Sequence, residues 1–280
     1  MQNTLESLDH LFCFTVDVED SFPGGALAAK FFVDIFKRYK VKGTFFVTAE
    51  VINKHPEFVL QIIKEGHEIA SHGYSHYRSS DKRPKGSGIL DHLSGDDLVK
   101  EVQRSAESGD KIGIELKGYR APSLRINAEG LKCLSAYFEY DSSFVKNSSN
   151  FRRCFKQQNQ TILDTPIYEF PISKTSLIKV PFGGPYLLRF NLPFILKLLI
   201  HLLPHDRPVV YYAHSFEGIP LSRAGQKISF IKWLWYEMQC GKNIDRFYSF
   251  FIESLLSKGF VFIRMQDLLK YRKIFNEVLL

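Results

Sequence analysis

The sequence predicts an α/β fold: a single-domain, seven-stranded β/α barrel that is distorted or incomplete. Three observations lead to this prediction. Short apolar runs typical of strands alternate with helical patterns along the chain. Seven such runs fit into 280 residues, a length that suits one domain, and no repeat or linker divides residues 1–280. The G-x-G-x-x-G and phosphate-loop patterns of nucleotide-binding open sheets are missing.

The predicted elements follow one another in a regular order. The strands are expected in LFCFTV (11–16), GTFFVT (43–48), HEIASH (67–72), GYRAP (118–122), YEFPIS (168–173), PVVYYAH (208–214) and GFVFIR (259–264). Helices are expected over 26–39, 56–65, 94–111, 127–137, 186–203 and 243–257, with a closing helix after 264. Ser94 and Asp97 suggest a helix N-cap with an acidic first turn. The polar segments 78–88 and 146–160 are expected to be loops.

Charge and cysteine usage restrict the partners and the compartment. The net charge of +7 is compatible with phosphate-rich partners such as a membrane surface or a nucleotide-linked sugar, although an ordinary basic surface is the favoured interpretation. No nucleic-acid-binding motif is present, so nucleic acid is not expected as a partner. The four cysteines are scattered, which indicates neither a disulfide framework nor a thiolate zinc site. With no signal-peptide pattern at the polar N-terminus, we expect a cytoplasmic protein.

Residues 186–203 form the most apolar segment, but charged and proline residues interrupt it too often for a membrane-spanning helix. A buried amphipathic helix is the favoured interpretation. The alternative is a helix lying on the inner membrane face, helped by the basic loop residues Lys82, Arg83 and Lys85.

Three carboxylates, Asp17, Glu19 and Asp20, follow the first strand directly. The carboxyl ends of barrel strands form the active-site face, which is where catalytic residues would be needed. Strand alternation sends Asp17 and Glu19 to the same side, so that one could bind a metal while the other acts as a base. An acidic turn that caps the next helix is the alternative.

His72 and His76 in SHGYSH lie four residues apart after another strand, a spacing at which two imidazoles can bind one divalent ion. With one carboxylate they would make three protein ligands and leave room for water or substrate, as in catalytic sites. Such a ligand set suits zinc, and it also suits cobalt, nickel or iron(II). Asp17 would then be free as a general base.

Two further residues stand at strand ends. His214 follows PVVYYA, where a histidine could protonate a departing amine, although a core histidine is equally compatible. Arg120, in GYRAP, could hold Asp17 ionised and oriented, or form a surface salt bridge.

In type and order, these motifs resemble those of the polysaccharide deacetylase family, the family 4 carbohydrate esterases. The motifs are TVDVED, SHGYSH, GYRAP and YYAHSFE. The core motifs lie within 11–217, and YDSSF and YEFPIS resemble elements of a subgroup from exopolysaccharide loci and peptidoglycan deacetylases. The resemblance implies a deacetylase-type barrel in which Asp17 is the base, His72 and His76 bind the metal, His214 is the acid and Arg120 orients Asp17.

One departure from the family pattern concerns the carboxylate ligand. The commonest motif has two adjacent aspartates, whereas Val18 follows Asp17 here, so the ligand is Glu19 or Asp20. The subgroup with an Asp-x-Asp pattern favours Glu19, in agreement with the strand alternation, and Asp20 stays the alternative.

The resemblance implies a hydrolase that removes an N-acetyl group from an amino sugar of a cell-envelope polysaccharide or its nucleotide- or lipid-linked precursor. The sugar, its linkage, its carrier and the oligomeric state are left open. A deformylase or another amidohydrolase on the same fold is the first alternative. A catalytically inactive saccharide-binding relative is the second, and it predicts a missing base, ligand or acid.

Overall fold

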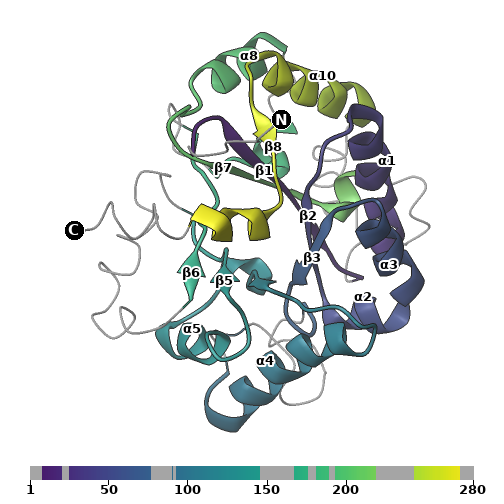
Figure 1. Cartoon of the computed structure of the whole chain (residues 1–280), viewed down its shortest axis with the longest axis vertical. Helices are drawn as coiled ribbons and strands as arrows, with labels where there is room; N and C mark the ends of the chain where they lie inside the picture. Colours follow the sequence, from purple (N-terminus) through teal and green to yellow (C-terminus); the bar gives the residue numbers. More distant parts are fainter. Residues whose placement is uncertain are drawn as a thin grey trace, which may run out of the picture.

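The computed structural model describes residues 8–20, 25–76, 90, 93–145, 167–175, 181–188, 193–218 and 243–271. Within these ranges the strands form one parallel sheet in the order β6-β5-β4-β3-β2-β1-β7, and β8 pairs with β1 beside this path. Helices lie outside the strands, from α8 and α10 past α1 and α3 to α4 and α5 (Figure 1). The predicted distorted barrel with seven principal strands is therefore confirmed. The predicted loops at 78–88 and 146–160 lie outside the described residues.

The strands agree in place with the apolar runs, although several are shorter. Their bounds are β1 Leu11–Val18, β2 Thr44–Val47, β3 Glu68–Ser71, β4 Gly118–Tyr119, β5 Tyr140–Asp141, β6 Tyr168–Glu169, β7 Val209–His214 and β8 Val261–Phe262. β5 was not among the predicted strands, because two residues are too few to show an alternating pattern. Between β6 and β7, isolated bridges such as Gly183 to Tyr212 replace a continuous ladder. This gap in the ladder is the distortion of the barrel.

The helices also match the predicted order with local differences. Their bounds are α1 Lys30–Tyr39, α2 Ala49–Lys54, α3 Pro56–Lys64, α4 Gly95–Asp110, α5 Ala128–Leu134, α7 Gly184–Leu187, α8 Pro193–His201 and α10 Ile244–Ser257. Four short 3-10 helices are η1 Gly25–Ala29, η3 Pro122–Leu124, η7 Ser215–Gly218 and η9 Met265–Tyr271. The helix expected from residue 26 thus begins as 3-10 structure, and the closing helix is 3-10 throughout. α2 was not predicted.

The expected helix over 186–203 is present as two described segments, α7 and α8. In α8, Leu196, Leu199 and Ile200 are buried in the main core, as the favoured interpretation required. Phe194 and Leu198 are exposed on the other side. No helix in the described ranges combines the length and the apolar character that crossing a membrane would need.

β1 pairs with β2, β7 and β8 and packs on both faces. Phe12, Phe14 and Val16 belong to the larger core between sheet and helices, while Leu11 and Cys13 belong to a second core inside the barrel. A buried phenylalanine contributes on the order of 2–3 kcal/mol through its apolar surface. The two-residue period of β1 therefore divides its side chains between an outer and an inner layer.

The amino ends of the strands are closed by η9. Met265, Leu268 and Leu269 join the inner core. The backbone N–H of Met265 donates to Thr44 Oγ1 at 2.8 Å, and that of Gln266 donates to Glu68 Oε2 at 2.9 Å. The inner core thus occupies the amino-terminal half of the barrel, and polar side chains gather at the carboxyl ends.

Glu68 is a buried carboxyl at this closed end. It accepts hydrogen bonds from Thr44 Oγ1 at 2.7 Å and from Tyr140 Oη at 2.8 Å, besides the N–H of Gln266. Burial raises the pKa of Glu68 from 4.5 to about 7, although these three donors oppose the rise. Because the folded-state pKa is raised, this group contributes most to stability below about pH 4, and the contribution is lost as pH rises through about 7.

We therefore expect Glu68→Gln to stabilise the protein above neutral pH. The amide cannot ionise, and it can accept from Thr44 and Gln266 while donating to Tyr140. The difference in unfolding free energy between variant and wild type should grow by roughly 1–3 kcal/mol from about pH 5 to about pH 8. Urea denaturation across this range measures it, with the exposed Glu57→Gln as control. A difference that does not change with pH would contradict the assignment.

Candidate active site

The inner face of β1 changes from apolar to polar toward its carboxyl end. The alternation that places Leu11 and Cys13 in the inner core places Thr15, Asp17 and Glu19 on the same side. Asp17 and Glu19 are only 3% and 1% exposed. In the parallel register Asp17 lies beside His214, at the end of β7. The acidic motif thus leads into the mouth of the barrel.

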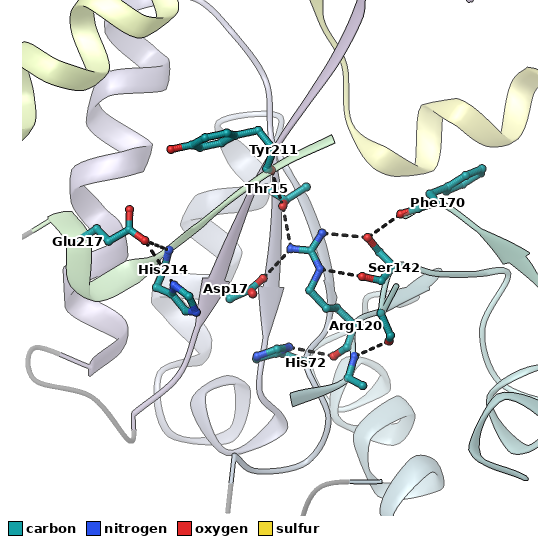
Figure 2. Close-up of polar contacts among 11 residues, drawn as sticks. Thr15, Asp17, His72, Arg120, Ser142, Phe170, Tyr211, His214 and Glu217 are labelled. Atoms are coloured by element: carbon teal, nitrogen blue, oxygen red, sulfur yellow. Dashed lines mark hydrogen bonds and ion pairs between the residues drawn. The ribbon is translucent and has the colours of Figure 1, made fainter. Parts of the chain in front are cut away.

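Arg120 follows β4, is completely buried, and binds through all three guanidinium nitrogens. Nη1 donates to Asp17 Oδ1 at 2.8 Å and to Thr15 Oγ1 at 2.7 Å. Nε and Nη2 donate to the carbonyl and the hydroxyl of Ser142 at 3.2 and 2.9 Å. The guanidinium lies between Asp17 and Ser142 (Figure 2), and the ring of Phe46 lies 4.0 Å from its Cζ. Removing one partner of a buried pair like this costs about 3–5 kcal/mol.

This pair keeps Asp17 ionised. Burial would raise the pKa of the Asp17 carboxyl, but the charge of Arg120, with smaller contributions from His72 and His214, outweighs burial and lowers the pKa below 3.8. The hydrogen bond from Arg120 goes to Oδ1. Oδ2 is therefore the oxygen that could accept a proton from a water molecule.

Glu19, His72 and His76 form a cluster with the chemistry of a metal site. Each offers a ligand atom, and these atoms lie within 4.8 Å of one another. Nδ1 of His76 is 3.4 Å from Oε2 of Glu19. Ligand atoms about 2.0–2.2 Å from a tetrahedral zinc ion lie roughly 3.4 Å apart, so this pair has the spacing that a shared ion requires.

The two imidazoles are prepared for ligation in other respects. His72 Nδ1 lies 2.9 Å from the backbone carbonyl oxygen of Arg120. This contact makes Nδ1–H the donor and leaves the Nε2 lone pair available, as second-shell bonds to metal ligands usually do. Burial lowers the pKa of His72, and burial together with His72 lowers the pKa of His76 to about 3. Both rings are neutral near pH 7, as ligation requires, so the residues fit a divalent cation.

Asp20, the alternative carboxylate, belongs to a different network. Its Oδ1 accepts the N–H of Ala26 at 3.0 Å, where η1 begins, and its Oδ2 accepts from Lys54 Nζ at 2.6 Å. Asp20 is not a member of the cluster of potential ligands. The two carboxylates that the sequence left open therefore lie in different places, Glu19 with the histidines and Asp20 at a helix entry.

His214 is fixed by a carboxylate three residues further along the chain. Oε1 of Glu217 lies 3.3 Å from His214 Nδ1 and accepts the backbone N–H of His214 at 2.9 Å. Tyr248 donates to the other oxygen of Glu217, and the ring of Phe216 stacks on His214 with centroids 4.9 Å apart. Burial would lower the pKa of His214, but the hydrogen bond and charge of Glu217, with Asp17 and Glu19, raise it.

The structure brings Asp17, Arg120 and His72 into one network of contacts (Figure 2), with His214 beside Asp17 in the register. Sequence reasoning assigned no role to Thr15, Ser142 or Glu217. The His-x-x-Glu spacing in YYAHSFE was a visible signal for Glu217, because a turn after a strand brings such residues together. Ser142 gave no comparable signal, since its contact with Arg120 spans 22 positions.

Comparisons with known proteins point to one family. Residues 18–137 match the family model described as polysaccharide deacetylase. The peptidoglycan-N-acetylmuramic acid deacetylase PdaC of Bacillus subtilis is 29% identical over 93 residues, which are 33% of this chain and 17% of that protein. The peptidoglycan-N-acetylglucosamine deacetylase of Bacillus cereus is 38% identical over 48 residues, 17% of this chain and 22% of that protein. The chain thus spans less than a quarter of the length of these two relatives.

Solved structures share the fold over most of the chain. The structure of PdaC from Bacillus subtilis has a TM-score of 0.54 at 16% identity, covering 96% of this chain and 94% of that one. A family 4 carbohydrate esterase pseudoenzyme from Bacillus anthracis has a TM-score of 0.53 at 14% identity, covering 93% of this chain and 66% of that one. At such identities these similarities show the fold. Together with the match over residues 18–137, which are less than half of the chain, they support a resemblance to the polysaccharide deacetylase family.

Proposed function

We propose that this protein is a metal-dependent hydrolase that removes the N-acetyl group from an amino sugar of a cell-envelope polysaccharide or of its nucleotide- or lipid-linked precursor. The observation that supports this most strongly is the combination at one sheet edge of an ionised carboxylate, a three-residue ligand cluster and a histidine with a raised pKa. Amide hydrolysis needs these three functions: a base, an electrophilic site and an acid.

The ligands in this proposal are Glu19, His72 and His76. A divalent cation, with zinc as the first choice, would supply Lewis acidity that polarises the amide carbonyl and makes a water molecule more acidic. The hydrogen bond from His72 Nδ1–H to the carbonyl of Arg120 orients the His72 ring toward the ligand cluster. Glu19 is the carboxylate of choice because it shares the cluster with both histidines.

The roles of base and acid follow from opposite shifts of two pKa values. Asp17, held ionised by Arg120, accepts a proton from the water that attacks the acetyl carbon. His214, whose pKa Glu217 raises, donates a proton to the nitrogen as the C–N bond breaks. Water and amide are converted to acetate and a free amine. The neighbouring register positions of Asp17 and His214 support these two roles, since they bring the two groups close together.

Acetate release from a panel of N-acetylated sugars tests the function and identifies the carrier. Free, nucleotide-linked, lipid-linked and polymeric substrates are incubated with zinc-loaded protein, with the chelated protein, with His72→Ala and with the exposed control His201→Ala. We expect release from one class only, lost on chelation and in His72→Ala but kept in His201→Ala. Formate release would favour the deformylase alternative, and metal binding without any product would favour an inactive relative such as the Bacillus anthracis pseudoenzyme.

Asp17→Asn tests whether Asp17 acts as the general base or as a metal ligand. We expect turnover at saturating metal to fall at least ~100-fold, the usual contribution of a general base, while the bound metal per chain stays the same. Steady-state kinetics and elemental analysis measure the two quantities. The exposed Asp34→Asn, which contacts only Lys30, serves as control. Loss of metal together with activity would show that Asp17 is a ligand and contradict its role as the base.

Glu217→Gln tests whether the charge of Glu217 sets the pKa of His214. Removing the carboxylate charge lowers the pKa of His214, because that charge raises it in the wild type. Since His214 must be protonated to donate, the alkaline limb of the turnover profile should move to lower pH, with metal affinity unchanged. The exposed Glu253→Gln, whose partner is Tyr39, should keep the wild-type profile. An unshifted alkaline limb in Glu217→Gln would exclude His214 as the acid.

A further inference from the structure

The loop between the two ligand histidines, Gly73 to Ser75, determines how far His76 lies from His72. It belongs to no helix or strand. A metal site requires its ligands within about 0.5 Å of the productive geometry. The position of His76 therefore depends on whatever holds this loop in place.

One side of the loop is bound by the first turn of α2. The N–H of Ala49 donates to the carbonyl of Gly73 at 2.9 Å, and the N–H of Glu50 donates to the carbonyl of Tyr74 at 3.1 Å. These are N–H groups of a helix start, which have no partner within the helix itself. The loop carbonyls are thus bound to α2, while the loop N–H groups face elsewhere.

The other side of the loop is bound by Glu101 of α4. Its Oε1 accepts the N–H of Tyr74 at 3.2 Å, and its buried Oε2 has no hydrogen-bond partner among the described residues. One turn further along α4, the guanidinium of Arg104 lies 3.7 Å from the centre of the Tyr74 ring. The loop is therefore held between α2, through its carbonyls, and α4, through the N–H and the ring of Tyr74.

Glu101 differs from the other acidic residues of α4. It is 0% exposed, whereas Asp96, Asp97, Glu107 and Asp110 are exposed. Burial raises the pKa of Glu101 to about 7, and the N–H groups of the loop and Arg104 oppose this rise. A buried carboxyl in a helix is unfavourable unless it is hydrogen bonded, and the bond that Glu101 accepts comes from the histidine loop, at Tyr74.

The backbone of the loop leaves few alternative conformations. Gly73 has φ +76°, and a Cβ there would lie 3.1 Å from both Pro122 Cγ and Tyr119 Oη. On a third side, the loop is thus packed against the segment that carries Arg120. The N–H of Tyr74, which Glu101 binds, thus belongs to a loop whose shape its neighbours specify closely.

We propose that Glu101 is a positioning residue for the metal site, acting through the N–H of Tyr74 to hold His76 at its distance from His72. This inference rests on the ligand set proposed above. Glu101 contacts neither histidine directly, so its effect is on the geometry of the ligands. The bond between α4 and the loop then couples the outer helix layer to metal affinity.

Metal affinity in Glu101→Leu tests the proposal. Leucine is close to glutamate in size but has no acceptor, so the N–H of Tyr74 loses its partner on α4. We expect the zinc Kd, measured by competition with a chromophoric chelator, to rise about 10-fold or more, within the range found for outer-shell partners of ligands. The absorption spectrum of the cobalt-loaded variant should also differ from that of the wild type, because the ligand geometry changes.

Glu107→Leu, exposed on the same helix, is the matched control and should keep wild-type affinity. Thermal unfolding of each metal-free variant separates positioning from folding. A Glu101→Leu protein with a lower Tm and an unchanged zinc Kd would show a purely structural role and overturn this inference alone. A wild-type protein that binds no zinc would instead overturn the ligand set of the proposed function, and this inference with it.

Discussion

A guanidinium with no exposed surface must have its donors satisfied inside the protein, and the mouth of the barrel is arranged around this requirement at Arg120. Its nitrogens bind Thr15 and Asp17 of β1 and Ser142 after β5. The hydroxyl of Ser142 in turn donates a hydrogen bond to the carbonyl of Phe170 after β6. The backbone carbonyl of Arg120 accepts from His72. One buried cation thus connects the carboxyl ends of four strands with the acidic and histidine motifs.

The two ends of the barrel use buried charge in different ways. At the amino end, Glu68 is surrounded by neutral donors and its pKa rises to about 7. At the carboxyl end, Asp17 faces a fixed cation and its pKa falls, while Glu217 raises the pKa of His214. Burial disfavours the charged form of each of these groups, so the sign of the nearest charge decides the protonation state. A base and an acid can therefore coexist on adjacent strands.

Sequence patterns predicted those elements whose period is long enough to detect. The alternation in β1 placed Asp17 and Glu19 on one face, and the helical patterns located α1, α3 and α4. The two-residue strand β5 and the short helix α2 could not be predicted in this way, because neither has a full period. The role of Glu101 was also invisible, since a glutamate in a mostly polar helix gives no sign that it is buried.

The sequence by itself determined most of the strands, the chemical types at their carboxyl ends and the resemblance to a family, because these depend on local period and on motifs. Only the tertiary structure decided the partners: Glu19 beside the histidines, Asp20 at a helix entry, and Glu217 on His214. The reason is physical. A motif specifies which groups are available, whereas the pKa and orientation of each group depend on contacts such as that between Asp17 and Arg120, which lie 103 positions apart.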